Sequence, residues 1–250
     1  MVCTIELLEN PKLKDPILIE GLPGIGFVAN ISALHLIKEL NAKLFARIVS
    51  ASFQDISITA DSGTARSPIN ELYYVKRAEC KNDLIIWYGN TQALSTFGQY
   101  ELCGKILDIA ENLGCHFLIS IGGYKKTEAK QIPVIYSAST DKKTMDTILN
   151  LGTKIMTGHI FGLAGLLIGM GKLRNMKGFS ILVETQGMYP DSVAARYALN
   201  MLDKYLNLSI KLVDLNKTTS NTKKLLEDFG IIKKISKEKK KEDQQTRWFI

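Results

Sequence analysis

The chain has 250 residues, of which 46% are hydrophobic and 23% are charged, and its formal net charge is +7. This composition is ordinary for a globular protein, and it excludes a disordered chain, a collagen-like chain and a disulfide-rich scaffold. The most apolar uncharged stretch, residues 160–171, is shorter than the roughly 20 residues needed to span a bilayer, so we expect no membrane span and no membrane partner.

Apolar runs typical of strands alternate along the chain with patterns typical of helices. Continuous apolar runs predict buried strands, and apolar residues spaced three and four apart predict helices. The predicted strands cover residues 17–19, 44–49, 72–75, 84–88, 117–121, 134–137 and 179–183. The predicted helices cover residues 27–40, 97–113, 141–149, 162–173, 190–206 and 222–229. Residues 50–69 have weak periodicity and are expected to form a long loop or an irregular hairpin.

This alternation predicts one α/β domain over residues 1–230, with three layers: a mostly parallel sheet and helices on both of its faces. Ser139 or Thr140 is expected to cap the helix at 141–149. Asp191 falls in the first turn of a later helix, where a carboxylate favours the positive helix end.

A glycine turn follows the first of these strands, with glycine at Gly21, Gly24 and Gly26. Such a turn exposes backbone N–H groups at a helix N-terminus, which suits anions. Its GxxGxG spacing differs from the GxGxxG of dinucleotide-binding proteins, and Phe27 stands where a phosphate-binding P-loop has lysine. We interpret the turn as a structural connection between strand and helix, with a ligand or phosphate site as the alternative.

Glu184 is the one acidic residue that we single out for a role at the sheet. It ends the predicted strand at 179–183, and ligands of α/β folds bind at the carboxyl edge of the sheet. A carboxylate without a base or a metal partner defines no reaction, so we interpret Glu184 as structural, with a functional role as the alternative.

No metal site, cofactor or catalytic residue is predicted. The three histidines, His35, His116 and His159, have no metal-binding spacing and are interpreted as structural. The four cysteines form no CxxC motif, so we expect a reduced, cytoplasmic protein.

The positive charge is concentrated at the C-terminus. Residues 231–250 contain seven basic and three acidic residues, so they carry +4 of the total charge and are predicted to form a flexible tail. Residues 1–230 show no basic stripe of the kind that nucleic-acid binding needs, and no nucleic-acid partner is expected. The chain ends in Trp248, Phe249 and Ile250, which suit either folding back onto the body or docking into a partner's pocket.

Several short motifs resemble, in order, those of the proteasome assembly chaperone 2 family in its archaeal form. They are GLPGIGFVAN at 21–30, SPINELY at 67–73, IGGY at 121–124, TGHIFGLAGLL at 157–167 and VET at 183–185, then Pro190-Asp191 and Ala194-Ala195. Each motif is weak alone, but the ordered set covers about residues 15–215.

This resemblance implies a fold similar to the nucleoside phosphorylase/hydrolase-like group and a non-enzymatic role. It implies binding to the α subunits of the 20S proteasome, as an assembly chaperone or an ATP-independent activator, by a homo-oligomer. Proteasome regulators end in a hydrophobic–tyrosine–any-residue motif that enters pockets between α subunits. Trp248, Phe249 and Ile250 resemble that motif, with phenylalanine in the tyrosine position.

Two other classes of function stay open at this point. One is a small-molecule enzyme, nucleoside- or carboxylate-directed, with a site formed by the Gly21–Gly26 turn, Gly122-Gly123 and Glu184. The other is a protein that binds nucleic acid or a membrane surface through its lysine-rich tail, which the nearly neutral body disfavours.

Overall fold

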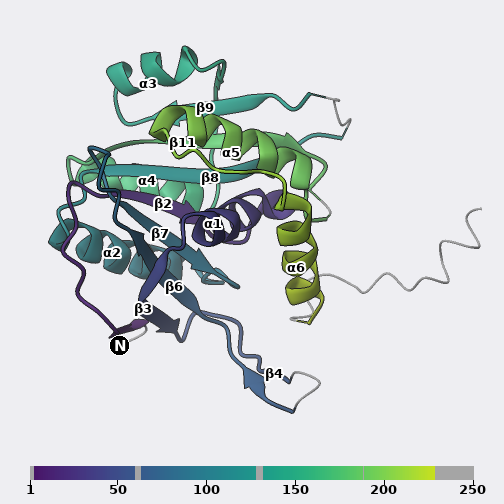
Figure 1. The fold of residues 1–250 in the computed structure, drawn as a ribbon. Helices are drawn as coiled ribbons and strands as arrows, with labels where there is room; N and C mark the ends of the chain where they lie inside the picture. The colour runs from purple at the N-terminus through teal and green to yellow at the C-terminus, as the bar shows by residue number, and fades with distance from the viewer. Residues whose placement is uncertain (1–2, 60–62, 128–131, 188, 229–250) are drawn as a thin grey trace, which may run out of the picture.

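A computed structural model describes residues 3–59, 63–127, 132–187 and 189–228. A nine-stranded sheet runs through the molecule in the order β1-β3-β6-β7-β2-β8-β11-β9-β10 (Figure 1). Its strands are β1 (Cys3–Leu7), β2 (Ile17–Gly21), β3 (Lys43–Ser50), β6 (Asn70–Val75), β7 (Leu84–Gly89), β8 (Phe117–Lys125), β9 (Ile135–Ser139), β10 (Lys154–Ile155) and β11 (Lys177–Thr185). A second, two-stranded sheet consists of β4 (Ile58–Thr59) and β5 (Ala65–Arg66).

The sheet is mixed, which corrects the prediction of a mostly parallel sheet. The central strands β7, β2, β8 and β11 are parallel neighbours, and β10 is parallel to β9. In contrast, β1, β3, β6 and β7 pair antiparallel in succession, and β9 pairs antiparallel with β11. Parallel neighbours need a long crossover, usually a helix. Among the described residues, no helix lies between β3 and β6 or between β6 and β7, so these strands pair as hairpins do.

Helices cover both faces of the sheet, as predicted. On one face, α1 (Val28–Glu39) and α5 (Ser192–Leu206) pack on the strands, and α6 (Leu215–Asp228) lies against both helices. On the other face lie α2 (Thr96–Asn112) and α4 (Leu163–Leu173). The short helix α3 (Lys142–Leu149) packs beside β9 and β11.

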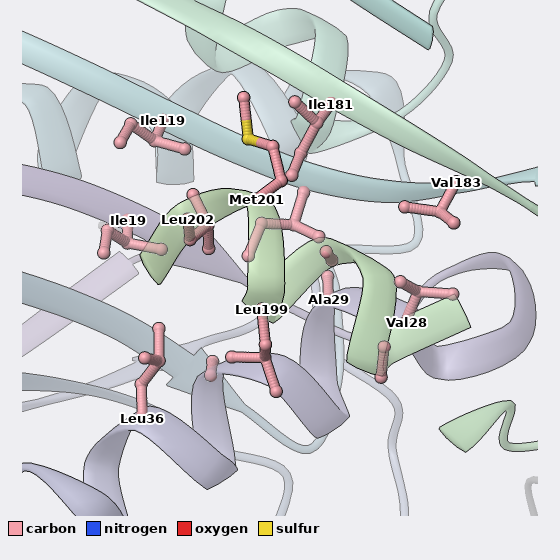
Figure 2. Close-up of a cluster of buried hydrophobic side chains, with 14 of the residues drawn as sticks. Ile19, Val28, Ala29, Leu36, Ile119, Ile181, Val183, Leu199, Met201 and Leu202 are labelled. Atoms are coloured by element: carbon pink, nitrogen blue, oxygen red, sulfur yellow. The ribbon is translucent and has the colours of Figure 1, made fainter. Parts of the chain in front are cut away.

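Each face of the sheet has its own hydrophobic core. Figure 2 shows the core under α1 and α5, where Leu199 and Leu202 of α5 lie against side chains of α1 and of the central strands. The core on the opposite face contains Leu18 and Trp87. Strand β2 is buried along its whole length because it faces both cores, and this explains its continuous apolar run.

The predicted elements are present, with differences at their ends. The edge strands β1 and β10 were not predicted, because β1 is largely exposed on both faces and β10 has only two residues. Helix α6 begins at Leu215, well before the predicted residue 222, because its first half is polar. The N-cap of α3 is Asp141, whose side chain accepts a hydrogen bond from the Thr144 N–H at 3.0 Å, rather than Ser139 or Thr140.

Two further features follow from the described residues. Between β3 and β6, the described residues include β4 and β5, which pair antiparallel and agree with the irregular hairpin that the sequence left as one of two possibilities. Within the described ranges, none of the helices combines the length and the apolar character that crossing a bilayer requires.

Candidate functional site

The glycine turn joins the carboxyl end of β2 to the N-terminus of α1, as predicted. It contains the single-turn 3-10 helix η1 (Ile25–Phe27), and two consecutive residues are left-handed: Gly26 at φ 64° and Phe27 at φ 52°. Glycine adopts this conformation without cost, whereas Phe27 does so because the packing of the turn holds it there. Its buried ring lies in the core beneath α1 and α5.

The glycines of this region allow close packing at the carboxyl end of the sheet. A Cβ atom at Gly21 would lie 2.1 Å from the Cβ atom of Ala33 in α1. A Cβ atom at Gly26 would lie 2.6 Å from Thr185 Oγ1, at the end of β11. One at Gly123, in β8, would lie 2.1 Å from the carbonyl oxygen of Ile25. These contacts show that the glycine turn packs directly against β8 and β11.

Gly24 differs from the other glycines of the turn. It has an extended backbone, and a Cβ atom there would meet nothing within 4 Å. Neither its conformation nor its surroundings therefore requires glycine, and Gly24 is the position of the turn at which a side chain could be added.

Asp191 connects the turn to the start of α5. Its backbone N–H donates to the carbonyl oxygen of Gly26 at 2.9 Å. Its carboxylate caps α5 by accepting from the Ala194 N–H at 2.9 Å, and it accepts from the Thr185 hydroxyl at 2.7 Å. We call Gly26, Gly123, Thr185 and Asp191 the turn locus. It holds the N-termini of α1 and α5 together at one end of the sheet.

Replacing Asp191 with alanine is expected to lower the free energy of unfolding by about 2 kcal/mol, because both the helix cap and the bond from Thr185 are lost. Unfolding in urea, followed by circular dichroism, measures this change. The matched variant Asp191→Asn keeps an oxygen that can cap the helix and should lose less than half as much. Equal losses for the two variants would show that capping is not what Asp191 contributes.

Glu184 does not join the turn locus, so the structure does not bring it together with the Gly21–Gly26 turn, as the alternative small-molecule site would require. Successive residues of a strand face opposite sides, so Thr185 lies on the face of α1 and α5 and Glu184 on the other. The Glu184 carboxylate accepts hydrogen bonds from the Val134 N–H and from the Tyr136 hydroxyl, both at 3.1 Å. Burial and the bond to Glu184 raise the pKa of Tyr136. These contacts tie the connection before β9 to β11.

Two buried asparagines were not predicted to be important. Asn30 donates to the carbonyl oxygen of Gly89 at 2.7 Å, and Asn70 bridges the Trp87 indole N–H, at 2.9 Å, and the carbonyl oxygen of Thr91, at 3.0 Å. Together they fix the end of β7 and the loop that follows it. Their signal in the sequence was their place in two of the family motifs: Asn30 ends the motif at 21–30, and Asn70 lies within the motif at 67–73.

Large apolar side chains are exposed around the same end of the sheet. They follow β2, β7 and β11 or immediately precede α4, and they include Ile25, Leu94, Phe97, Phe161 and Tyr189. Phe161 is the most exposed of them, at 86%. Clusters of exposed apolar side chains are typical of protein-binding surfaces. In the described part of the chain, no group of three or more His, Cys, Asp or Glu residues could hold a metal ion.

The predicted docking residues Trp248, Phe249 and Ile250 lie outside the residues that the structure describes, as does the rest of the tail at 231–250. The site that can be built from the described residues is therefore the carboxyl end of the sheet. It consists of the turn locus and the exposed apolar side chains around it.

Comparison with known proteins identifies relatives along almost the whole chain. The chain is 35% identical to Pyrococcus furiosus PbaB, an archaeal proteasome activator, with a TM-score of 0.82 and coverage of 92% of this chain and 99% of PbaB. It is 26% identical to Pyrococcus furiosus PbaA, an archaeal homolog of proteasome-assembly chaperone, with a TM-score of 0.74 and coverage of 90% and 94%.

A relative of unknown role is the uncharacterized protein MJ1210 of Methanocaldococcus jannaschii, which is 30% identical over 239 residues, 95% of this chain and 90% of that protein. Residues 18–229 match the PAC2 family. This match spans every motif on which the sequence resemblance rested. The chain therefore belongs to the PAC2 family.

Proposed function

We propose that this protein binds the α ring of the 20S proteasome and acts as an assembly chaperone or an ATP-independent activator. The observation that carries the proposal is the similarity to PbaB, an archaeal proteasome activator, which extends over 99% of that chain. The similarity to PbaA, a homolog of proteasome-assembly chaperone, supports the chaperone alternative. An ATP-driven mechanism is disfavoured because Phe27 occupies the position of a P-loop lysine.

In this proposal, residues 1–230 form the body and residues 231–250 form the docking tail. The tail's three terminal residues supply apolar anchors and a free carboxylate, which a pocket between α subunits could receive. The twelve residues at 236–247 can span at most about 40 Å when extended, enough to reach across a partner much larger than the chain.

Phe249 differs from the tyrosine of the proteasome-regulator motif by one hydroxyl group. A single hydrogen bond contributes about 0.5–1.5 kcal/mol net, so docking can survive its loss while gate opening is weakened. Several tails on one homo-oligomer would compensate, because avidity can raise binding about 10²–10⁴-fold when the geometry allows. We also infer a likeness to the nucleoside phosphorylase/hydrolase-like fold, which rests on the family resemblance alone.

Deleting Trp248, Phe249 and Ile250 is expected to abolish binding to purified archaeal 20S particles. The deletion removes the apolar anchors and moves the terminal carboxylate away from the position in which they present it. Co-sedimentation and peptide hydrolysis measure binding and gate opening separately. The full chain with Lys234→Ala is the matched control, since it changes tail charge but keeps the terminus. Phe249→Tyr restores the missing hydroxyl and should increase peptide hydrolysis above that of the native chain.

Binding that survives the deletion would overturn docking through the tail. Binding to isolated α subunits but not to assembled particles would favour the chaperone role over the activator role. No binding to either form would overturn the proposal as a whole.

A further inference from the structure

Helix α6 lies against α1 and α5 on the outside of the molecule (Figure 1). The connection that leads into it from α5 is anchored by apolar side chains. Leu208 and Leu215 are buried in the core beneath α1 and α5, and Ile210 and Leu212 pack against that core. The body therefore holds the chain firmly up to Leu215, the first residue of α6.

Beyond Leu215, the described side chains that α6 buries are polar. They are Thr218 and Thr222, which are 2% and 1% exposed. Among the described residues, the Thr222 hydroxyl has no hydrogen-bond partner. A buried hydroxyl that has left water without gaining another partner favours an open state, in which water solvates it again.

Thr218 contacts His35 of α1, whose ring is buried as well. His35 Nε2 lies 2.8 Å from the Lys211 carbonyl oxygen, and Nδ1 lies 3.4 Å from Thr218 Oγ1. A carbonyl oxygen only accepts, so Nε2 of the neutral ring carries the proton and Nδ1 accepts from the threonine. The shorter bond holds the connection before α6, and the bond to the helix itself is the longer and weaker of the two.

A like-charge contact also acts against the docking of α6. Lys38, in the last turn of α1, has a lowered pKa because of partial desolvation and the charge of Lys217 in α6. The two ammonium groups therefore lie near each other across the contact. Their repulsion is small because both residues are exposed, and it is relieved when α6 moves away.

The sequence of α6 gives the helix little stability of its own. Six of its fourteen residues are serine, threonine or asparagine, which favour helices weakly, and none is alanine. The Thr219 and Ser220 hydroxyls donate to the carbonyl oxygens four residues earlier, at 2.9 and 3.0 Å, a contact that slightly destabilises helices. An isolated helix of this length is marginal in water. The helix therefore depends on its contacts with α1 and α5.

We propose that residues 216–228 form a strap that opens as one unit at Leu215 while the body stays folded. The buried apolar anchors of the connection all precede this hinge, and the contacts of Thr218 and Thr222 after it are weak. Opening releases thirteen residues, which extend by at most about 45 Å. The use of the strap as a longer tether for the docking tail rests on the proposed function, whereas the opening itself does not.

Hydrogen exchange of the full chain, followed by mass spectrometry, measures the opening and needs no proteasome. Backbone amides of residues 219–228 should exchange at least about a hundredfold faster than those of α5, because local opening costs less than global unfolding. Exchange in α5 also reports, for every variant, whether the body is still folded.

The same substitution at two threonines should move the exchange of α6 in opposite directions. Thr222→Val removes the unpartnered hydroxyl and should slow exchange about tenfold, whereas Thr218→Val leaves His35 Nδ1 without a donor and should accelerate exchange. Threonine and valine have similar helix propensities, so the helix itself is little changed. The matched control is Thr147→Val at an exposed position of α3, which should leave the exchange of α6 unchanged.

Amides of α6 that are protected as strongly as those of α5 would overturn the inference. A Thr222→Val chain whose α6 exchanges at the native rate or faster would overturn it as well. A chain that binds no proteasome, yet exchanges as expected, would contradict the proposed function and leave the strap in place.

Discussion

Replacing Gly123 with alanine is expected to lower the free energy of unfolding by about 3 kcal/mol. The added Cβ atom would lie 2.1 Å from the carbonyl oxygen of Ile25 and 2.9 Å from Thr185 Cγ2. The obstructing oxygen belongs to the backbone of a turn that Asp191 holds through Gly26, so it cannot rotate aside as a side chain could. The turn must shift away from β8, and the N-termini of α1 and α5 must move with it. Equilibrium unfolding in urea measures the loss.

Gly169 provides the matched control for this prediction. It is exposed within α4, and a Cβ atom there would meet nothing within 4 Å. Alanine at Gly169 should therefore stabilise the protein by about 0.5–1 kcal/mol, because alanine favours a helix more than glycine does. The same substitution thus has opposite signs at the two positions. A Gly123→Ala variant as stable as the native chain would show that the turn does not pack on β8 as described.

The sequence was sufficient to identify the glycine turn but not its partners. The GxxGxG pattern between a strand and a helix predicted the turn, and the absence of a P-loop lysine at Phe27 favoured a structural role. Gly21 meets Ala33 of the helix that follows it, but Ile25 packs on Gly123 and Gly26 packs on Thr185, which are about 100 and 160 residues away along the chain. Such contacts depend on the order of strands in the sheet, which local patterns do not determine.

At the end of β11, the residue that contacts the glycine turn is Thr185 and not Glu184. Glu184 was selected because a carboxylate at the carboxyl edge of a sheet is a typical functional group, whereas Thr185 contacts the turn. The period of two in a strand could have given the answer. Val183 belongs to the core on the side of α1 and α5, so the residue two positions later had to share that face. Glu184 was singled out for its charge, whereas the alternation of faces along β11 points to Thr185.

The strands at the centre of the sheet could be predicted from the sequence, whereas the edge strand β1 could not. Continuous apolar runs identified β2, β7, β8 and β11, because strands buried on both faces have no polar alternation. The edge strand β1 escaped prediction because it has few buried side chains, and its pairing with β3 depends on backbone hydrogen bonds. Backbone hydrogen bonds do not depend on the pattern of side chains. Edge strands are therefore the elements of a sheet that are hardest to predict from sequence.

Glu20 is expected to make the protein less stable as the pH rises from about 4.5 to about 8. Its side chain is 1% exposed within β2, and Oε1 accepts from the Leu22 N–H at 2.8 Å. Among the described residues, Oε2 has no hydrogen-bond partner. Burial raises the pKa of this carboxyl group from 4.5 to about 8, although the backbone N–H groups of Leu22 and Ile121 favour the charged form and act in the opposite direction.

The sign of this dependence follows from the two protonation equilibria. Below pH 4.5, Glu20 is protonated in both the folded and the unfolded chain, and its contribution to stability is fully present. Between about pH 4.5 and 8, the unfolded chain releases the proton while the folded chain keeps it. Each pH unit then costs the folded state about 1.4 kcal/mol, so the total loss is of the order of 4–5 kcal/mol. Urea unfolding at pH 5, 7 and 9 measures it.

Replacing Glu20 with glutamine should remove most of this pH dependence, because a neutral amide of similar shape carries no charge at either pH. The variant should be more stable than the native chain at pH 9 and of similar stability at pH 5. The matched control is Glu6→Gln, since the Glu6 side chain is 62% exposed on β1 and its charge stays in water in both states. If Glu20→Gln and Glu6→Gln keep the same pH dependence as the native chain, the proton held at Glu20 is not the cause, and a different buried group must be responsible.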